Sequence, residues 1–132
     1  MKGIKNIKPI YGLIAISVLT IIPFLGITDF YTKGEPREAI VALTMIESGN
    51  WILPTIGGID LAYKPPLFHW SIALLSQIFG DISEFASRLP SALSFVALVL
   101  ITFLHYCKNN VKVALGAALV LLSFFETHRA AF

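Results

Sequence analysis

Residues 89–107, LPSALSFVALVLITFLHYC, contain no Asp, Glu, Lys or Arg. Roughly 20 helical residues cross a bilayer core about 30 Å thick, so this stretch predicts a transmembrane helix. Two other uncharged runs, Ile10–Ile27 and the shorter Val113–Phe125, lie on either side of it. The 132-residue chain is 56% hydrophobic and 14% charged, a composition that indicates a membrane protein. Because spanning segments must pair their own backbone groups, we expect an all-α, polytopic fold.

The basic residues predict how the chain is oriented. Loops rich in Lys and Arg stay on the cytoplasmic side, and Lys residues precede Ile10–Ile27 and follow Cys107. Ile10–Ile27 is longer than a usual signal-peptide core and has no small-residue cleavage site, so we interpret it as an uncleaved anchor in which Pro23 is tolerated. We predict about three spans, arranged as a cytoplasmic N-terminus and first span at 1–28, an outer loop at 29–88, a second span at 89–107 and the start of a truncated third at 113–132.

The predicted outer loop carries two apolar segments too short to cross a bilayer. Pro36 and the acidic residues beside it favour a helix start, Ala39, Ala42, Leu43 and Ile46 form one apolar face, and Ser48-Gly49-Asn50 favours a helix end. Leu67–Phe79 is a second short helix, ending before Gly80. Both are expected to lie flat at the membrane interface, with Trp51 and Trp70 at headgroup depth. A buried half-helix is the alternative for Leu67–Phe79.

Charge and cysteine content exclude several classes of function. The net charge of +2, without a run of Lys or Arg, gives no basic patch for nucleic acid. Cys107 is the one cysteine, so the chain can form no disulfide within itself and no Cys-rich metal site.

Four stretches in a fixed order carry a resemblance to a known family. They are GEPREAIVALTMIESGNWILP at 34–54, YKPPLFHW at 63–70, IFG at 78–80 and EFASRLPSAL at 84–93. In this order and spacing, the chain from about Ile10 to Phe132 resembles the N-terminal portion of membrane glycosyltransferases of the GT-C type. That family includes bacterial aminoarabinose transferases and protein O-mannosyltransferases, which take a sugar from a polyprenyl-phosphate carrier. Its members are several-fold longer, so the resemblance implies that this chain is a fragment or was cut short.

The resemblance implies that Lys64 and Arg37 bind the donor phosphate. Transfer leaves negative charge on that phosphate, which a fixed cation stabilises. Pro65 and Pro66 restrict the backbone after Lys64, and the planar fork of Arg37 grips phosphate oxygens in pairs. The structural alternatives are a lysine that only reaches toward lipid headgroups and an arginine that forms an ion pair on the helix surface.

The acidic positions depart from the family pattern. Gly34 stands where relatives have an Asp before the Glu-x-Arg sequence, so Glu35, or Asp29 from the end of the first span, is the candidate catalytic carboxylate. Glu35 is equally explained as a favourable charge at a helix start. Tyr63 stands where many relatives have a Glu, so a metal site inferred there loses a ligand. Tyr63 and His69 are possible substrate contacts, although a lone His in an apolar helix is usually a packing residue.

These expectations define one function and one alternative. The resemblance implies part of an integral-membrane glycosyltransferase that moves a hexosyl or pentosyl unit from a polyprenyl-phosphate donor to a lipid, glycan or protein acceptor. Its active site would face the outer side of a bacterial inner membrane, with membrane lipids as further partners. No cofactor and no metal are predicted, although a divalent metal is compatible with the family. The alternative is a small non-catalytic membrane assembly subunit or a degenerate relative.

Overall fold

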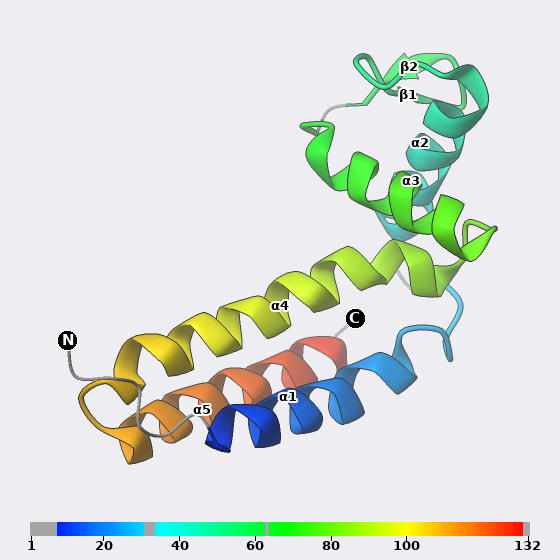
Figure 1. The fold of residues 1–132 in the computed structure, drawn as a ribbon. Coiled ribbons are helices and arrows are strands. Elements are labelled where there is room, and N and C mark those ends of the chain that lie inside the picture. The colour runs from blue at the N-terminus through cyan, green and yellow to red at the C-terminus, as the bar shows by residue number, and fades with distance from the viewer. Residues whose placement is uncertain (1–7, 31–33, 63, 131–132) are drawn as a thin grey trace. The chain divides into compact units, whose positions relative to one another are not determined.

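The computed structural model describes residues 8–30, 34–62 and 64–130, and the side chains of 9–30, 34–62 and 64–124. The chain divides into two compact units (Figure 1). One comprises residues 1–23 and 92–132, and the other comprises residues 24–91. The helix α4, Glu84–Cys107, begins in the second unit and continues into the first. The two units are therefore described separately.

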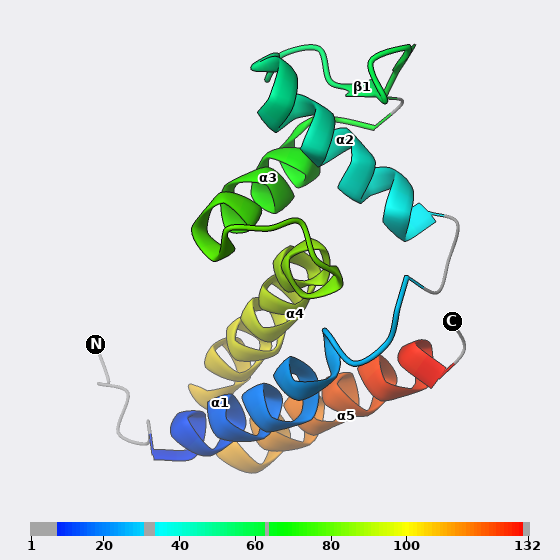
Figure 2. The same ribbon diagram turned by 90° about the vertical axis from the view of Figure 1, so that its right-hand side faces the viewer.

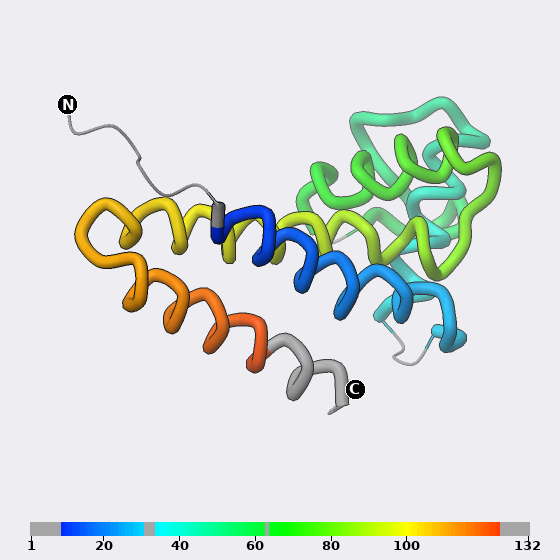
Figure 3. The backbone as a smooth tube through the Cα atoms, turned by 60° about the horizontal axis from the view of Figure 1, so that its bottom comes forward, coloured from blue at the N-terminus to red at the C-terminus, as the bar shows by residue number. Residues whose placement is uncertain are grey.

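The first unit is helical where it is described. Helix α1, Lys8–Ile21, and helix α5, Val111–Ala130, run side by side (Figure 3). Each buries a residue at every fourth position along one face. In α5 the buried side chains include two alanines, and such small residues let helices approach closely. The buried positions are Leu13, Ser17 and Ile21 in α1 and Ala114, Ala118 and Leu122 in α5.

The first helix is shorter than the predicted first span, and Pro23 explains the difference. The α-helix stops at Ile21 and gives way to a short 3₁₀ turn, Ile22–Phe24, instead of continuing to Ile27. A proline lacks the backbone N–H and clashes with the carbonyl four residues earlier, which explains why the helix ends here. The interpretation of Pro23 as a residue inside a continuous helix was wrong.

One helix in the described part of the chain is long and apolar enough to cross a membrane. This helix is α4, with 24 residues and a mean hydropathy of 1.8 over its most apolar window. It starts at Glu84, five residues before the predicted start at Leu89, and it contains Pro90. The other apolar helical segments fall in the range of 10–17 residues, namely Pro9–Phe24, Leu67–Phe79 and Val111–Phe124. The expected count of about three spans remains a prediction.

In the second unit, helix α2, Gly34–Ser48, packs against helix α3, Leu67–Phe79 (Figure 2). The bounds of α3 are those predicted from the sequence. The contact centres on Ala42, Ile72 and Ala73, with Ile46, Trp51 and Phe68 around them. The predicted face of α2 was partly wrong, because Leu43 is 40% exposed whereas Val41 and Met45 are buried.

A small antiparallel hairpin departs from the all-α expectation. Strand β1, Thr55–Ile56, pairs with strand β2, Asp60–Leu61. Gly57 and Gly58 form the turn with φ values of 59° and 79°. Two successive positive φ values suit a tight hairpin turn, and glycine adopts them without steric cost. The glycine pair therefore explains why the chain reverses here.

Glycines also end both helices of the second unit. Gly80 has a φ of 83°, and its backbone N–H donates to the carbonyl of Ser76. Gly49 has a φ of 69°, and its N–H donates to the carbonyl of Met45. The sequence predicted such a left-handed end at Gly49, and for α3 it predicted only that the helix ends before Gly80.

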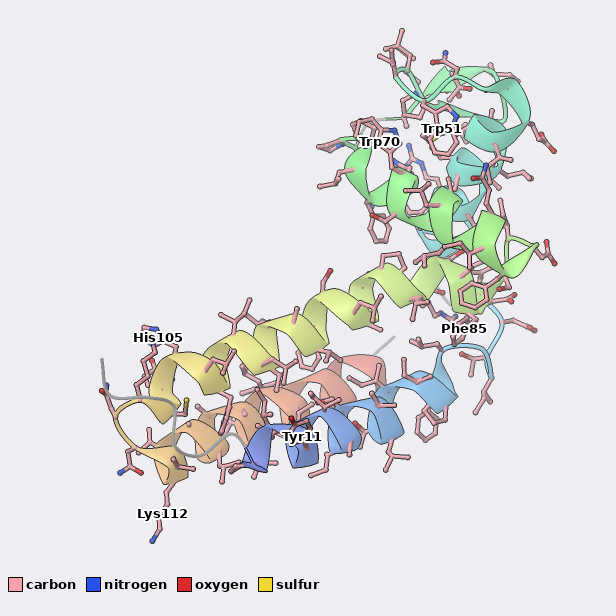
Figure 4. All side chains as sticks on the ribbon, viewed as in Figure 1. Tyr11, Trp51, Trp70, Phe85, His105 and Lys112 are labelled. Atoms are coloured by element: carbon pink, nitrogen blue, oxygen red, sulfur yellow. The ribbon has the colours of Figure 1, made fainter. Side chains whose placement is uncertain are left out.

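Trp70 joins the start of α3 to the loop between α2 and β1. Its indole N–H donates to the backbone carbonyl of Trp51 over 2.7 Å, and the two labelled side chains lie near one another in Figure 4. Because this bond fixes the loop between α2 and β1 against α3, it helps to position the segment that leads to Lys64.

Candidate functional site

The buried carboxylate of Glu38 contacts two basic side chains of the second unit, those of Lys64 and His69. The Lys64 Nζ lies 2.7 Å from Glu38 Oε1, and the His69 Nε2 lies 2.6 Å from Glu38 Oε2. Glu38 comes from α2, Lys64 from the segment before α3, and His69 from the first turn of α3. We call Glu38, Lys64 and His69 the carboxylate cluster.

The three members of the cluster differ strongly in their exposure. The side chain of Glu38 is 10% exposed and that of His69 is 1% exposed, whereas that of Lys64 is 64% exposed. Lys64 therefore lies between the buried carboxylate and the solvent. A buried carboxylate requires such partners, because an unpaired charge is costly away from water.

Two buried atoms of the cluster retain unused hydrogen-bonding capacity. Among the described residues, neither His69 Nδ1 nor Glu38 Oε2 has a hydrogen-bond partner. His69 Nε2 therefore lies close to Glu38 Oε2, at 2.6 Å, but the two groups are not aligned for a hydrogen bond. Buried polar atoms are nearly always paired in proteins, so unpaired ones often mark a place where a ligand or water binds.

A cavity of about 50 Å³ opens beside the cluster. It has room for a few water molecules but not for a sugar ring. Its walls place the basic side chains of Arg37 and Lys64 beside the carboxylate of Glu38. Such a site suits a small anion approaching from the exposed side of Lys64. The full lining comprises Arg37, Glu38, Val41, Ala62, Lys64 and His69.

A second polar centre of this unit forms around Arg88, in the first half of α4. Its Nε and Nη2 donate to the two oxygens of Glu35 over 3.3 and 3.0 Å. Its Nη1 donates to the carbonyls of Leu25 and Thr28 over 2.9 and 2.8 Å, and its Nη2 donates to the carbonyl of Asp29 over 3.0 Å. A further contact of 3.2 Å reaches the hydroxyl of Thr28. We call Arg88 and these partners the arginine hub.

The structure divides the predicted site residues between these two centres. Arg37, Lys64 and His69 meet at the cavity. Glu35 and the backbone of Asp29 lie at the arginine hub instead. Tyr63 lies outside the described residues. The described residues hold no group of three or more His, Cys, Asp or Glu side chains that could bind a metal ion.

Sequence reasoning missed Glu38 and Arg88. Glu38 could have been found from helical spacing, because it precedes the buried Val41, Ala42 and Met45 by three, four and seven residues. Arg88 lies 53 residues from Glu35 along the chain, and no local pattern connects them.

Comparison with known proteins follows the same stretches of the chain. The family model described as dolichyl-phosphate-mannose-protein mannosyltransferase matches residues 63–131. An undecaprenyl phosphate-α-4-amino-4-deoxy-L-arabinose arabinosyl transferase from Shewanella sediminis is 36% identical over 102 residues, covering 76% of this chain and 18% of that protein. A protein of the same name from Pseudomonas savastanoi pv. phaseolicola is 33% identical over 114 residues, covering 85% of this chain and 21% of that protein.

The matched region is a small part of these relatives. The chain spans about a fifth of the length of the curated proteins that it matches. No solved structure matches it significantly.

Proposed function

Because this chain belongs to the dolichyl-phosphate-mannose-protein mannosyltransferase family, we propose that it forms part of an integral-membrane glycosyltransferase with a polyprenyl-phosphate-linked sugar as donor. The names of its relatives support a pentosyl unit such as 4-amino-4-deoxy-L-arabinose, carried on undecaprenyl phosphate. The acceptor is a hydroxyl group of a lipid, glycan or protein on the outer face of the membrane. The observation that carries this proposal is the cationic cavity of Arg37 and Lys64, formed by the segments that resemble the family.

The reaction explains why cations are needed at this place. When the sugar leaves, the bond between its anomeric carbon and the phosphate oxygen breaks, and the electron pair stays with the phosphate. The phosphate thereby gains negative charge in the transition state, which a pre-positioned cation stabilises. Lys64 is exposed enough to reach a phosphate, and Arg37 lines the same cavity. We assign both residues to the donor phosphate.

The surface of α3 supports a position at the lipid boundary. Its buried face carries His69, Ile72, Ala73 and Ser76. The opposite face is apolar and open, with Leu67, Leu74 and Ile78 exposed by 69%, 54% and 75%. An exposed face made of large apolar residues suits a helix that contacts lipid. This arrangement would hold Lys64, just before α3, at the depth of lipid phosphates.

Substitution of Lys64 tests the proposal. In the natural protein, in its own membranes, Lys64→Ala and Lys64→Gln should each lower sugar transfer by about 10²–10³-fold, the usual effect of removing one donor to a developing oxyanion. Lys64→Arg should retain part of the activity because it keeps the charge. Transfer is measured with a radiolabelled sugar on undecaprenyl phosphate. Lys112→Gln, an exposed lysine at the start of α5, is the matched control.

Two outcomes would contradict the proposal. Transfer near the wild-type level in both Lys64→Ala and Lys64→Gln would reduce Lys64 to a membrane anchor. A wild-type protein that neither binds undecaprenyl phosphate nor transfers sugar would support the non-catalytic subunit instead.

A further inference from the structure

Lys64 is required in two places at once if the proposed function is correct. Its ammonium group already pairs with Glu38 over 2.7 Å, and the same group is assigned to the donor phosphate. The exposed side chain of Lys64 can move, since it has four rotatable bonds and lies largely in solvent. Glu38 is held on α2 and is nearly buried, so it cannot follow. Binding of a phosphate by Lys64 must therefore weaken its contact with Glu38.

We propose that the donor phosphate draws Lys64 away from Glu38, and that this exposes the Glu38 carboxylate as the proton acceptor for the acceptor hydroxyl. This inference rests on the proposed function and deepens it. It assigns to Glu38 the catalytic role for which Glu35 and Asp29 were candidates from the sequence. The structure favours Glu38 because it lines the cavity together with Arg37 and Lys64, whereas Glu35 is bound at the arginine hub.

The transfer step balances with these groups. The acceptor oxygen forms a bond to the anomeric carbon of the sugar as the bond from that carbon to the phosphate oxygen breaks. The proton of the acceptor hydroxyl passes to Glu38. The electron pair of the broken bond remains on the polyprenyl phosphate, where Lys64 and Arg37 stabilise it. Release of the lipid phosphate lets Lys64 return to Glu38 after the proton has left to solvent.

The polar atoms of the cluster are arranged for this exchange. His69 contacts Glu38 through Nε2 from the buried side, so the carboxylate keeps one basic neighbour when Lys64 moves. Departure of Lys64 frees Glu38 Oε1 for the incoming hydroxyl, and His69 Nδ1, which is buried without a hydrogen-bond partner among the described residues, has capacity for a bridging water. His69 acts through Glu38 and is therefore a positioning residue.

The proposal makes an unusual prediction for Glu38→Gln. The amide cannot accept the proton of the acceptor, so transfer should fall by at least about 100-fold. The same change frees Lys64 from its ion pair, so binding of undecaprenyl phosphate should become tighter. Because the Lys64 end of this ion pair is exposed to solvent, the pair shifts an equilibrium constant by only about two- to fivefold, which sets the size of the gain. If the role of Glu38 were purely structural, Glu38→Gln would lower both sugar transfer and the affinity for undecaprenyl phosphate.

The measurement pairs two readouts on the purified natural protein. Affinity for undecaprenyl phosphate is determined in detergent micelles, and sugar transfer is determined separately. Glu47→Gln, an exposed glutamate of the same helix, is the matched control and should change neither. In the Lys64→Gln background, Glu38→Gln should give no gain in affinity. A gain that persists there would show that the effect does not pass through Lys64 and would overturn the proposal.

A second experiment uses the wild-type protein and so does not depend on the folding of a variant. An apolar carbodiimide labels accessible carboxyl groups, and mass spectrometry locates the modified residues. Addition of undecaprenyl phosphate should increase labelling of Glu38 severalfold and leave Glu47 unchanged. If undecaprenyl phosphate binds but labelling of Glu38 stays constant or falls, the exchange of Lys64 is wrong while the proposed function stands. If undecaprenyl phosphate does not bind at all, the proposed function fails as well.

Discussion

Replacing Arg88 with alanine should loosen the segment that precedes α2. The guanidinium makes six contacts, with Glu35 and with backbone and hydroxyl oxygens of Leu25, Thr28 and Asp29. Removing one partner of a fully buried ion pair costs about 3–5 kcal/mol. Since 16% of the Arg88 side chain and 32% of the Glu35 side chain remain exposed, water compensates part of this loss. We therefore expect Arg88→Ala to destabilise the hub by about 2–3 kcal/mol.

Hydrogen exchange measures this effect where it occurs. A loss of about 2–3 kcal/mol increases the open population about 30–150-fold, and amides of residues 25–30 and of the first turn of α2 should exchange faster by that factor. Arg88→Lys keeps the charge but supplies three donors in a different geometry, so it should recover about half of the protection. Lys112→Ala removes a cation of α5 and is the control. Unchanged exchange at residues 25–30 in Arg88→Ala would refute the reasoning.

Two further predictions concern topology and a helix end. In a background where Cys107 is replaced by Ser, a membrane-impermeant thiol reagent added from outside should label a cysteine at position 58 but not at position 110; labelling at 110 would favour four spans over three. Gly80→Ala should destabilise the protein by about 1 kcal/mol in thermal unfolding, because an L residue is strained at a φ of 83° although a Cβ there meets no atom within 4 Å. Gly12→Ala, where a Cβ is equally unhindered and φ is not positive, is the control for Gly80→Ala and should not lower stability.

The boundaries of α3 and the end of α2 could be predicted because they depend on prolines and glycines that directly flank the helices. Pro65 and Pro66 precede α3 and Gly80 follows it, so both ends were correct. The same holds for the end of α2 at Gly49. The buried face of α2 was harder, because Leu43 and Val41 are both apolar and the choice between them depends on where α3 packs.

The candidate site was only half predictable for a related reason. Lys64 and Arg37 were identified through the family resemblance, and both line the cavity. Glu38 was interpreted from the sequence as one of the acidic residues that favour a helix start, and not as a member of a site. Its partners Lys64 and His69 approach from another segment of the chain, and a single sequence does not show such contacts.

The arginine hub can form only after Arg88 has been synthesised, which affects the order of folding during biosynthesis. Arg88 lies 63 residues after Leu25, whose carbonyl it binds. A ribosome adding about 5–20 residues per second needs about 3–13 s to make the intervening chain. During that interval the carbonyls of Leu25, Thr28 and Asp29 can pair only with water, headgroups or other segments. The beginning of the second unit is therefore completed last, when the start of α4 leaves the translation machinery, although it is synthesised first.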